Sequence, residues 1–298
     1  MLRKKMAGVF ITLMLIVLTA CGKTEDASKK GVQVAVSPAA ESLTEEVSES
    51  PVPEKTEEAS GELIEVNVLE EGYFQEGELI YKILKGDKTV EVSMKDGAGQ
   101  EVVIPEKATD DGTGKSYKVV TIGENCFAAH EELVSVSIPD TVTDIKKEAF
   151  TNCVALKQVK ISNGLKTIED SAFFGCEALT ELSLPEGLKS IGDEAFSNCF
   201  ALKKLTIPST TETIGLEAFW ACSELEELVI PEGVKTIGSR AFYDCGALAK
   251  VTLPESLEGL DGDAFLYDLS MKQLIVPEGK LEYYQDIFKE YVFEVVAG

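Results

Sequence analysis

The chain has 298 residues, 44% of them hydrophobic, and a formal net charge of −24 at pH 7. Its length and apolar content are sufficient for a sizeable core. Its acidity argues against nucleic-acid binding, because a polyanion is bound by clustered Lys and Arg, and no such cluster occurs beyond the first five residues.

Residues 1–20 have the pattern of an export signal peptide. A cationic start, MLRKK, precedes an apolar stretch at 7–20 that is shorter than the ~20 residues a membrane-spanning helix needs. Cys21 follows directly, and the sequence LTAC that it ends resembles the lipobox of bacterial lipoproteins. The resemblance implies a diacylglyceryl group on Cys21, which would hold the protein on a membrane. The alternative is an ordinary signal peptide with a chance cysteine.

Residues 21–61 are rich in Ser, Glu, Pro and Lys and contain no aromatic residue. Such a composition buries too little apolar surface to offset the entropy of ordering, so it predicts a disordered acidic tether. A long hydrophilic tether suits the outer face of a Gram-positive type of membrane. We therefore expect the protein on the extracellular face of the bacterial cell membrane, attached by its lipid.

Residues 62–106 are expected to form an N-terminal β cap. The segment 78–94, ELIYKILKGDKTVEVSM, alternates apolar and polar residues on both sides of a Lys-Gly-Asp turn, which is typical of a β-hairpin. The segment 101–105, EVVIP, ends like the strands that follow it, and 107–117, KATDDGTGKSY, predicts a protruding turn.

Residues 107–276 are expected to form the repeat domain, in which the units from Leu133 to Met271 follow one another with a step of 23 residues and no insertion. Self-similarity of this period indicates a solenoid, in which each unit buries its apolar side only by stacking on its neighbours. The units begin at Leu133, Leu156, Leu179, Leu202, Leu225, Leu248 and Met271, and one phenylalanine column runs through Phe127, Phe150, Phe173, Phe196, Phe219, Phe242, Phe265 and Phe288.

The repeat L-x-x-L-x-I-P…I…A-F-x-x-C resembles the BspA-type leucine-rich repeats of bacterial surface proteins over about residues 100–288. The resemblance implies an α/β solenoid, a right-handed superhelix with one short parallel strand per coil on its concave side. It also implies a role in cell-surface adhesion and interaction.

The residues of one unit agree with that architecture. In LTELSLP, Leu182 and Leu184 alternate with polar residues, as in a half-buried strand, and Pro185 ends the strand. In DEAFSNC, Asp193 is expected to cap about one helical turn. Residues 277–298 keep Phe288 in its column and are expected to close the solenoid as a C-terminal cap.

Five cysteines fall in one column of the repeat, at Cys153, Cys176, Cys199, Cys222 and Cys245. Metal-binding and redox cysteines usually occur as close pairs, and stacked coils hold equivalent Cβ atoms about 4.8 Å apart, wider than the ~3.8 Å of a disulfide. We therefore interpret these cysteines as small buried apolar residues.

His130, the only histidine, occupies the same column one coil before Cys153. This spacing leaves open a Cys–His enzyme, although no third orienting group can be named. The sequence contains no Gly-rich phosphate loop, so we expect no cofactor, no metal and no enzymatic activity.

Two surfaces are candidates for ligand binding. The first is the solvent-facing side of the strands, which presents mixed charges and hydroxyls at Gln158, Glu181, Lys204, Glu227, Lys250 and Thr206. The second lies one residue after the phenylalanine column, where Trp220, Tyr243 and Leu266 follow one another on consecutive coils. Adjacent exposed aromatic side chains often anchor interfaces.

The preferred hypothesis is a lipid-anchored surface module that binds a protein or glycan ligand through the strand face, with the aromatic column as second choice. A passive surface spacer is the alternative outside the class of binding proteins. The ligand itself cannot be named from the sequence.

Overall fold

A computed structural model describes residues 72–86, 88–94 and 99–298. The predicted signal peptide, Cys21 and the predicted tether lie outside these residues. No helix in the described part of the chain has the length and apolarity to cross a membrane.

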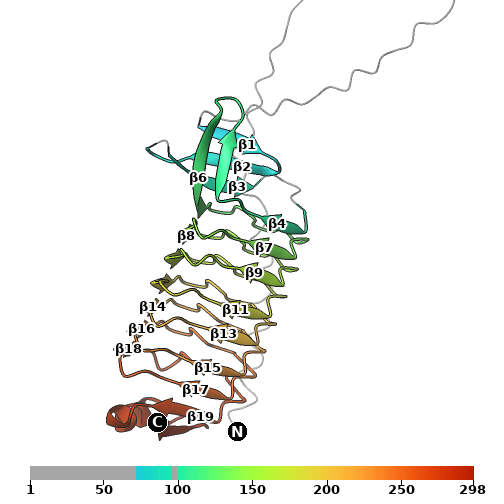
Figure 1. The fold of residues 1–298 in the computed structure, drawn as a ribbon. Coiled ribbons are helices and arrows are strands. Elements are labelled where there is room, and N and C mark those ends of the chain that lie inside the picture. The colour runs from blue at the N-terminus through green and yellow to red at the C-terminus, as the bar shows by residue number, and fades with distance from the viewer. Residues whose placement is uncertain (1–71, 87, 95–98) are drawn as a thin grey trace, which may run out of the picture. The chain divides into compact units, whose positions relative to one another are not determined.

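The described chain is a β-solenoid whose coils stack one on another (Figure 1). Each repeat contributes two strands, not the single strand that the resemblance implied. The longer strands are β7 (Ser135–Ser137), β9 (Gln158–Lys160), β11 (Glu181–Ser183), β13 (Lys204–Thr206), β15 (Glu227–Val229), β17 (Lys250–Thr252) and β19 (Gln273–Val276). The shorter ones are β8 (Asp144–Ile145), β10 (Thr167–Ile168), β12 (Ser190–Ile191), β14 (Thr213–Ile214), β16 (Thr236–Ile237) and β18 (Gly259–Leu260).

In the strand ladders, each residue pairs with the residue 23 positions further along the chain. Glu181 of β11 pairs in parallel with Lys204 of β13, and Ser190 of β12 pairs in the same way with Thr213 of β14. The short strands form a continuous ladder from β8 to β18, whereas strand pairing between the longer strands is interrupted between β9 and β11 and between β13 and β15. The predicted 23-residue β-solenoid is therefore confirmed.

The third side of each coil is a turn, and here the prediction of a helical turn is wrong. In residues 193–199 the backbone adopts positive φ at Glu194 (54°) and Asn198 (60°). The N–H of Phe196 donates to the carbonyl of Ala218 at 2.7 Å, so the segment bonds to the next coil. Asp193 caps no helix, since its Oδ1 accepts the N–H of Leu216 at 2.8 Å. The N–H groups of Glu194, Phe196 and Asn198 thus bond to carbonyls 22 residues further on, while those of Ser197 and Cys199 bond three residues back within the turn. Every second N–H is satisfied by the next coil, so no continuous helical bonding is needed.

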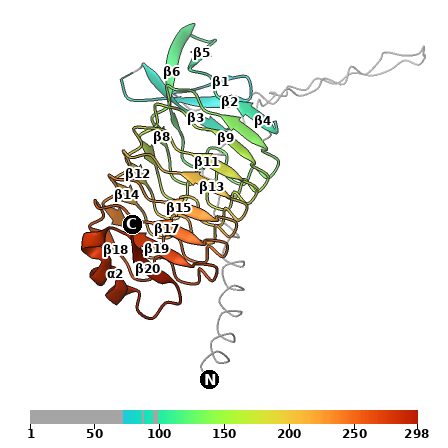
Figure 2. The same cartoon turned by 60° about the horizontal axis from the view of Figure 1, so that its bottom comes forward.

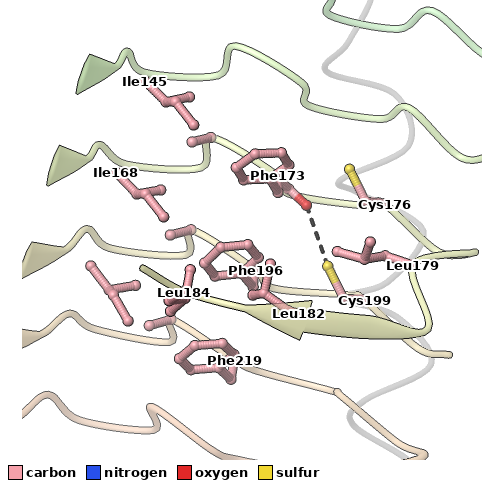
Figure 3. Packing of buried hydrophobic residues seen from close by; sticks show 14 of the residues in the cluster. Ile145, Ile168, Phe173, Cys176, Leu179, Leu182, Leu184, Phe196, Cys199 and Phe219 are labelled. Atoms are coloured by element: carbon pink, nitrogen blue, oxygen red, sulfur yellow. Dashed lines mark hydrogen bonds between the residues drawn. The ribbon is translucent and has the colours of Figure 1, made fainter. Parts of the chain in front are cut away.

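The core is a column of stacked phenylalanine rings along the solenoid axis (Figure 3). From Phe127 to Phe242 neighbouring rings lie 4.9 to 5.3 Å apart and within 7° of parallel, and each ring is fully buried. Buried strand residues such as Leu182 and Ile191 fill the space between the rings and the ladders. One continuous core therefore runs through all the coils, as the repeat predicted.

The chain before the repeats forms an antiparallel sheet joined to the short-strand ladder. Its strands are β1 (Tyr73–Glu76), β2 (Leu79–Ile83) and β3 (Thr89–Met94), and β2 pairs with β3 as the expected hairpin. β4 (Glu101–Val103) pairs with β7 and so begins the ladder of longer strands. β5 (Lys107–Asp110) and β6 (Lys115–Ile122) form a hairpin at the predicted protruding turn, and β6 also pairs with β3 and β8.

The last coil is covered by a 3-10 turn (Glu278–Lys280), the helix α2 (Leu281–Ile287) and the strand β20 (Glu294–Ala297), which pairs with β19 (Figure 2). Phe288 remains under Phe265, but the two ring planes are inclined by 51°. Tyr284, Tyr291 and Phe293 surround Phe288. Tilting the last ring thus ends the parallel stack and lets other aromatic side chains cover it.

Candidate functional site

The cysteine column is buried in the core. All six cysteines of the described residues are unpaired and buried, and the Cys199 Sγ–H donates to the carbonyl oxygen of Phe173 at 3.4 Å (Figure 3). Cys153, Cys176, Cys222 and Cys245 donate in the same way to the phenylalanine carbonyl 26 positions earlier. The cysteines therefore act as small core residues with a weak donor.

Cys153 is not arranged as a nucleophile. Burial raises the pKa of its thiol to about 12, so the thiol stays protonated at neutral pH. A hydrogen bond from the backbone of His130 lowers this pKa, but by less than burial raises it. No cluster of His, Cys, Asp or Glu suited to a metal ion occurs among the described residues.

The cysteine column continues one coil beyond Cys245 with a carboxyl group, that of Asp268. This side chain is 6% exposed; its Oδ1 accepts the N–H of Cys245 at 2.8 Å, and its Oδ2 has no hydrogen-bond partner. Burial, with a smaller contribution from Asp244, raises the pKa of Asp268 to about 9. Asp268 is therefore protonated at neutral pH and occupies the cysteine position as a neutral group.

The first predicted surface, the long-strand face, is present as expected from the alternation. Gln158, Glu181, Lys204, Thr206, Glu227 and Lys250 are all exposed there. Lys204 forms an ion pair with Glu181 across the ladder at 3.0 Å, with side chains 76% and 66% exposed. Among the apolar residues of the face, Val229 is 65% exposed. The face presents alternating charges and few apolar groups.

A groove on the short-strand side was not predicted. It has a volume of about 570 Å³ and is lined by Ser190, Thr213 and Thr236 and by Gly192, Gly215 and Gly238. A β-carbon at Gly215 would lie 2.6 Å from the backbone nitrogen of Asp193, so the close approach of the preceding coil requires glycine. The signal in the sequence is the dipeptide Ile-Gly, repeated at one position in three consecutive coils.

Charged side chains border this groove in ion pairs. Glu212 accepts from Lys235 at 2.8 Å and from Lys189 at 3.3 Å, and these two bonds hold the pKa of Glu212 below its usual value. These three side chains therefore have little unpaired charge to offer a ligand, and the carboxylates of Asp193 and Asp261 remain in the lining of the groove.

The second predicted surface lies on the turn side of the C-terminal coils. Trp220 and Tyr243 are half-buried neighbours with ring centroids 6.4 Å apart, and Leu266 is 36% exposed on the next coil. The structure adds Tyr267, 41% exposed, whose ring makes an edge contact with Tyr243 at 5.1 Å. We call Trp220, Tyr243, Leu266 and Tyr267 the turn-face patch.

Tyr267 was missed because it lies outside the column examined in the sequence. Its position has positive φ in every coil from 129 onward and is otherwise occupied by Ala129, Asn152, Gly175, Asn198, Ala221 and Asp244. A tyrosine at φ 69° is unusual for a side chain of this size. One large residue in a column of small and polar ones was the available signal.

Carboxylates flank the turn-face patch. Glu217 and Trp220 are the first and last residues of one turn, in which the Trp220 N–H donates to the Glu217 carbonyl at 3.0 Å. The pKa of Tyr243 is raised by burial first and then by Tyr267, Asp244 and Asp263. The Asp244 N–H donates to the carbonyl of Leu266 at 3.0 Å, and the Leu266 N–H donates to the carbonyl of Asp263 at 3.1 Å. Glu194, one coil before Glu217, has its pKa raised by burial first and then by neighbouring carboxylates, Glu217 foremost.

The comparisons with known proteins agree with this description. A family model described as a BspA type leucine rich repeat region matches residues 115–226 and 213–294, in six copies. No curated protein matches the chain.

One solved structure shows the same fold, and two further ones are similar to the chain with lower TM-scores. A leucine-rich repeat protein of T. pallidum is 25% identical with a TM-score of 0.51, and the match covers 77% of this chain and 99% of that one. A leucine-rich cell surface protein of Faecalibacterium prausnitzii is 25% identical with a TM-score of 0.48, over 69% and 70% of the two chains. A leucine-rich repeat protein of Bacteroides ovatus is 24% identical with a TM-score of 0.42, over 68% and 70%.

Proposed function

The chain belongs to the BspA-type leucine-rich repeat family, and from this membership we propose that it is a cell-surface binding protein that holds a protein or glycan ligand on its solenoid surface. Leucine-rich repeat proteins generally mediate protein interaction or adhesion. The proposed activity is non-catalytic recognition.

The observation that carries this proposal is the turn-face patch. The core residues of the repeats are almost completely covered, yet Leu266 and Tyr267 are more than a third exposed beside Trp220 and Tyr243 on consecutive coils. Leu269, two residues further on, is 81% exposed. Soluble proteins rarely gather large apolar side chains at their surface without a use for them, and aromatic residues are prominent among interface hot spots.

The long-strand face is the second candidate surface for the same function. It is favoured by the exposed Lys204 and Lys250, which lie on β13 and β17 of that face. Once a ligand is found, Lys204→Glu with Lys250→Glu can be compared with Trp220→Ala with Tyr243→Ala. A loss of more than about 2 kcal/mol of binding free energy in one pair alone identifies the surface used.

The proposed location is the outer face of a bacterial cell membrane, reached through a lipid on Cys21. The support is the LTAC sequence and the hydrophilic composition of residues 22–61. Metabolic labelling with a fatty acid should label the wild type and not Cys21→Ala. A wild-type protein without label would contradict the anchoring.

The binding proposal is tested with the soluble chain from residue 22 to 298, screened against matrix proteins, envelope polymers and a glycan array. We expect saturable binding that persists after thiol alkylation, because the cysteines are buried. If no material binds and cells lacking the protein adhere normally, the chain is a spacer and the proposal is wrong.

A further inference from the structure

The turn-face patch combines two properties that restrict its partner. Its apolar part consists of three rings and a leucine on three consecutive coils, where Trp220 meets Tyr243 and Tyr243 meets Tyr267. One coil before Trp220 the equivalent residue is Ser197, which is small, polar and fully buried. The large side chains of the patch therefore begin at Trp220. Four large side chains, two of them more than a third exposed, are therefore gathered where a partner can reach them.

The border of the patch has an excess of negative charge. Backbone hydrogen bonds place Glu217 beside Trp220, and Asp244 and Asp263 beside Leu266. Glu194 lies in the same position of the repeat one coil before Glu217. Arg240 is the cation among them, and it is already engaged, with Nη1 3.0 Å from Glu217 and Nε 3.8 Å from Asp263. Asp244 has no ion pair within the described residues, so the border has carboxylates to offer a partner.

This arrangement favours a partner that carries both cationic and apolar groups. Carboxylates beside partly buried rings lose hydration when a partner covers them, and that loss is offset only if a cation pairs with them. A cation near the face of Trp220 or a tyrosine gains further attraction from the ring. An anionic polymer or membrane surface would be repelled.

We propose that the turn-face patch and its acidic border bind a basic protein segment that carries Lys or Arg together with apolar side chains. The proposal rests on the proposed function, because it names the partner class for one of its two candidate surfaces. It specifies which surface is used and which chemistry it recognises.

Trp220 provides a direct readout, since it is the only tryptophan in the chain. The probe is a synthetic peptide in which Lys and Leu alternate, titrated into the chain from residue 22 to 298 while tryptophan emission and binding heat are recorded. The comparison probes are the same peptide with Glu in place of Lys and a neutral chitin oligosaccharide. We expect the Lys–Leu peptide alone to shift Trp220 emission, with an affinity that falls as salt is raised.

Two variants divide the apolar from the charged contribution. Tyr267→Asn places at the positive-φ position the residue found there in Asn152 and Asn198, so the fold should be retained. We expect it to weaken peptide binding about tenfold, the loss of a moderate hot spot. Asp244→Asn with Glu194→Gln should weaken binding about threefold to tenfold at low salt and reduce its salt dependence. The matched control on the exposed side of α2, Glu282→Gln with Tyr283→Asn, lies outside both candidate surfaces and should change affinity by less than about twofold.

The outcomes separate this inference from the proposed function. Equal binding of the Glu–Leu peptide, an emission shift with the oligosaccharide and not with the Lys–Leu peptide, or an equal effect of the control variant overturns the basic partner. A ligand from the wider screen that is lost only with the Lys204 and Lys250 variants also overturns it, while the binding function stands. Because the wild-type salt dependence and emission shift need no variant, the test holds even if a substitution unfolds the chain.

Discussion

Asp268 should make the stability of the protein depend on pH over a defined range. Its ordinary pKa is 3.8 and its pKa in the folded chain is about 9. Between these two values the unfolded chain has lost the proton of Asp268 while the folded chain retains it. Because its pKa is raised in the folded state, Asp268 does not lower the free energy of unfolding below about pH 4. Its destabilising contribution then grows as the pH rises and becomes constant above about pH 9.

The magnitude follows from the size of this shift. One pKa unit corresponds to 1.36 kcal/mol, so from pH 4 to pH 7 the chain should lose up to about 4 kcal/mol through this one group. Asp268→Asn keeps a side-chain oxygen that can accept the Cys245 N–H and removes the titration. We expect the variant to match the wild type near pH 4 and to be more stable by about 2–4 kcal/mol at pH 7.

The assay is urea unfolding followed by circular dichroism at several pH values between 4 and 9. The informative quantity is the difference between variant and wild type, because the other carboxylates titrate equally in both chains. Asp268→Cys, which restores the residue of the column, is a second variant that should behave in the same way. If the difference in unfolding free energy does not change with pH, Asp268 is not a buried neutral acid and the reasoning is refuted.

Three further predictions concern the core and its stacking. Phe196→Ala removes a ring that stacks on two neighbours at 5.1 and 5.3 Å, and should cost about 3–5 kcal/mol in urea unfolding; a loss below about 1 kcal/mol would show that the coils relax around the space. Gly215→Ala places a methyl group against the backbone of Asp193, and should cost about 1–3 kcal/mol by the same measurement; an unchanged midpoint would contradict the close approach. A thiol reagent should leave the six cysteines unmodified in the native protein and modify them in denaturant; rapid native labelling of Cys199 would place that thiol at the surface.

The candidate surfaces show how far the sequence could be used. The exposed members of the long-strand face were predicted correctly from alternation alone, because successive side chains of a strand point to opposite sides. Trp220 and Tyr243 were placed next to one another by the repeat, and the structure brings them to 6.4 Å. Tyr267 and the glycine-floored groove were not found, since each depends on how a turn is directed in space.

The sequence by itself determined the period, the column of core phenylalanines and the burial of the cysteines. An exact 23-residue step holds equivalent residues in register from coil to coil, so one alignment of the sequence fixes every neighbour along the axis. The tertiary structure decided what the chain does between the strands. DEAFSNC could satisfy its N–H groups within a helical turn or against a neighbouring coil, and its local sequence does not distinguish these. Only when the next coil is in place is the carbonyl of Ala218 2.7 Å from the N–H of Phe196, and that contact, made between coils, selects the turn over the helix.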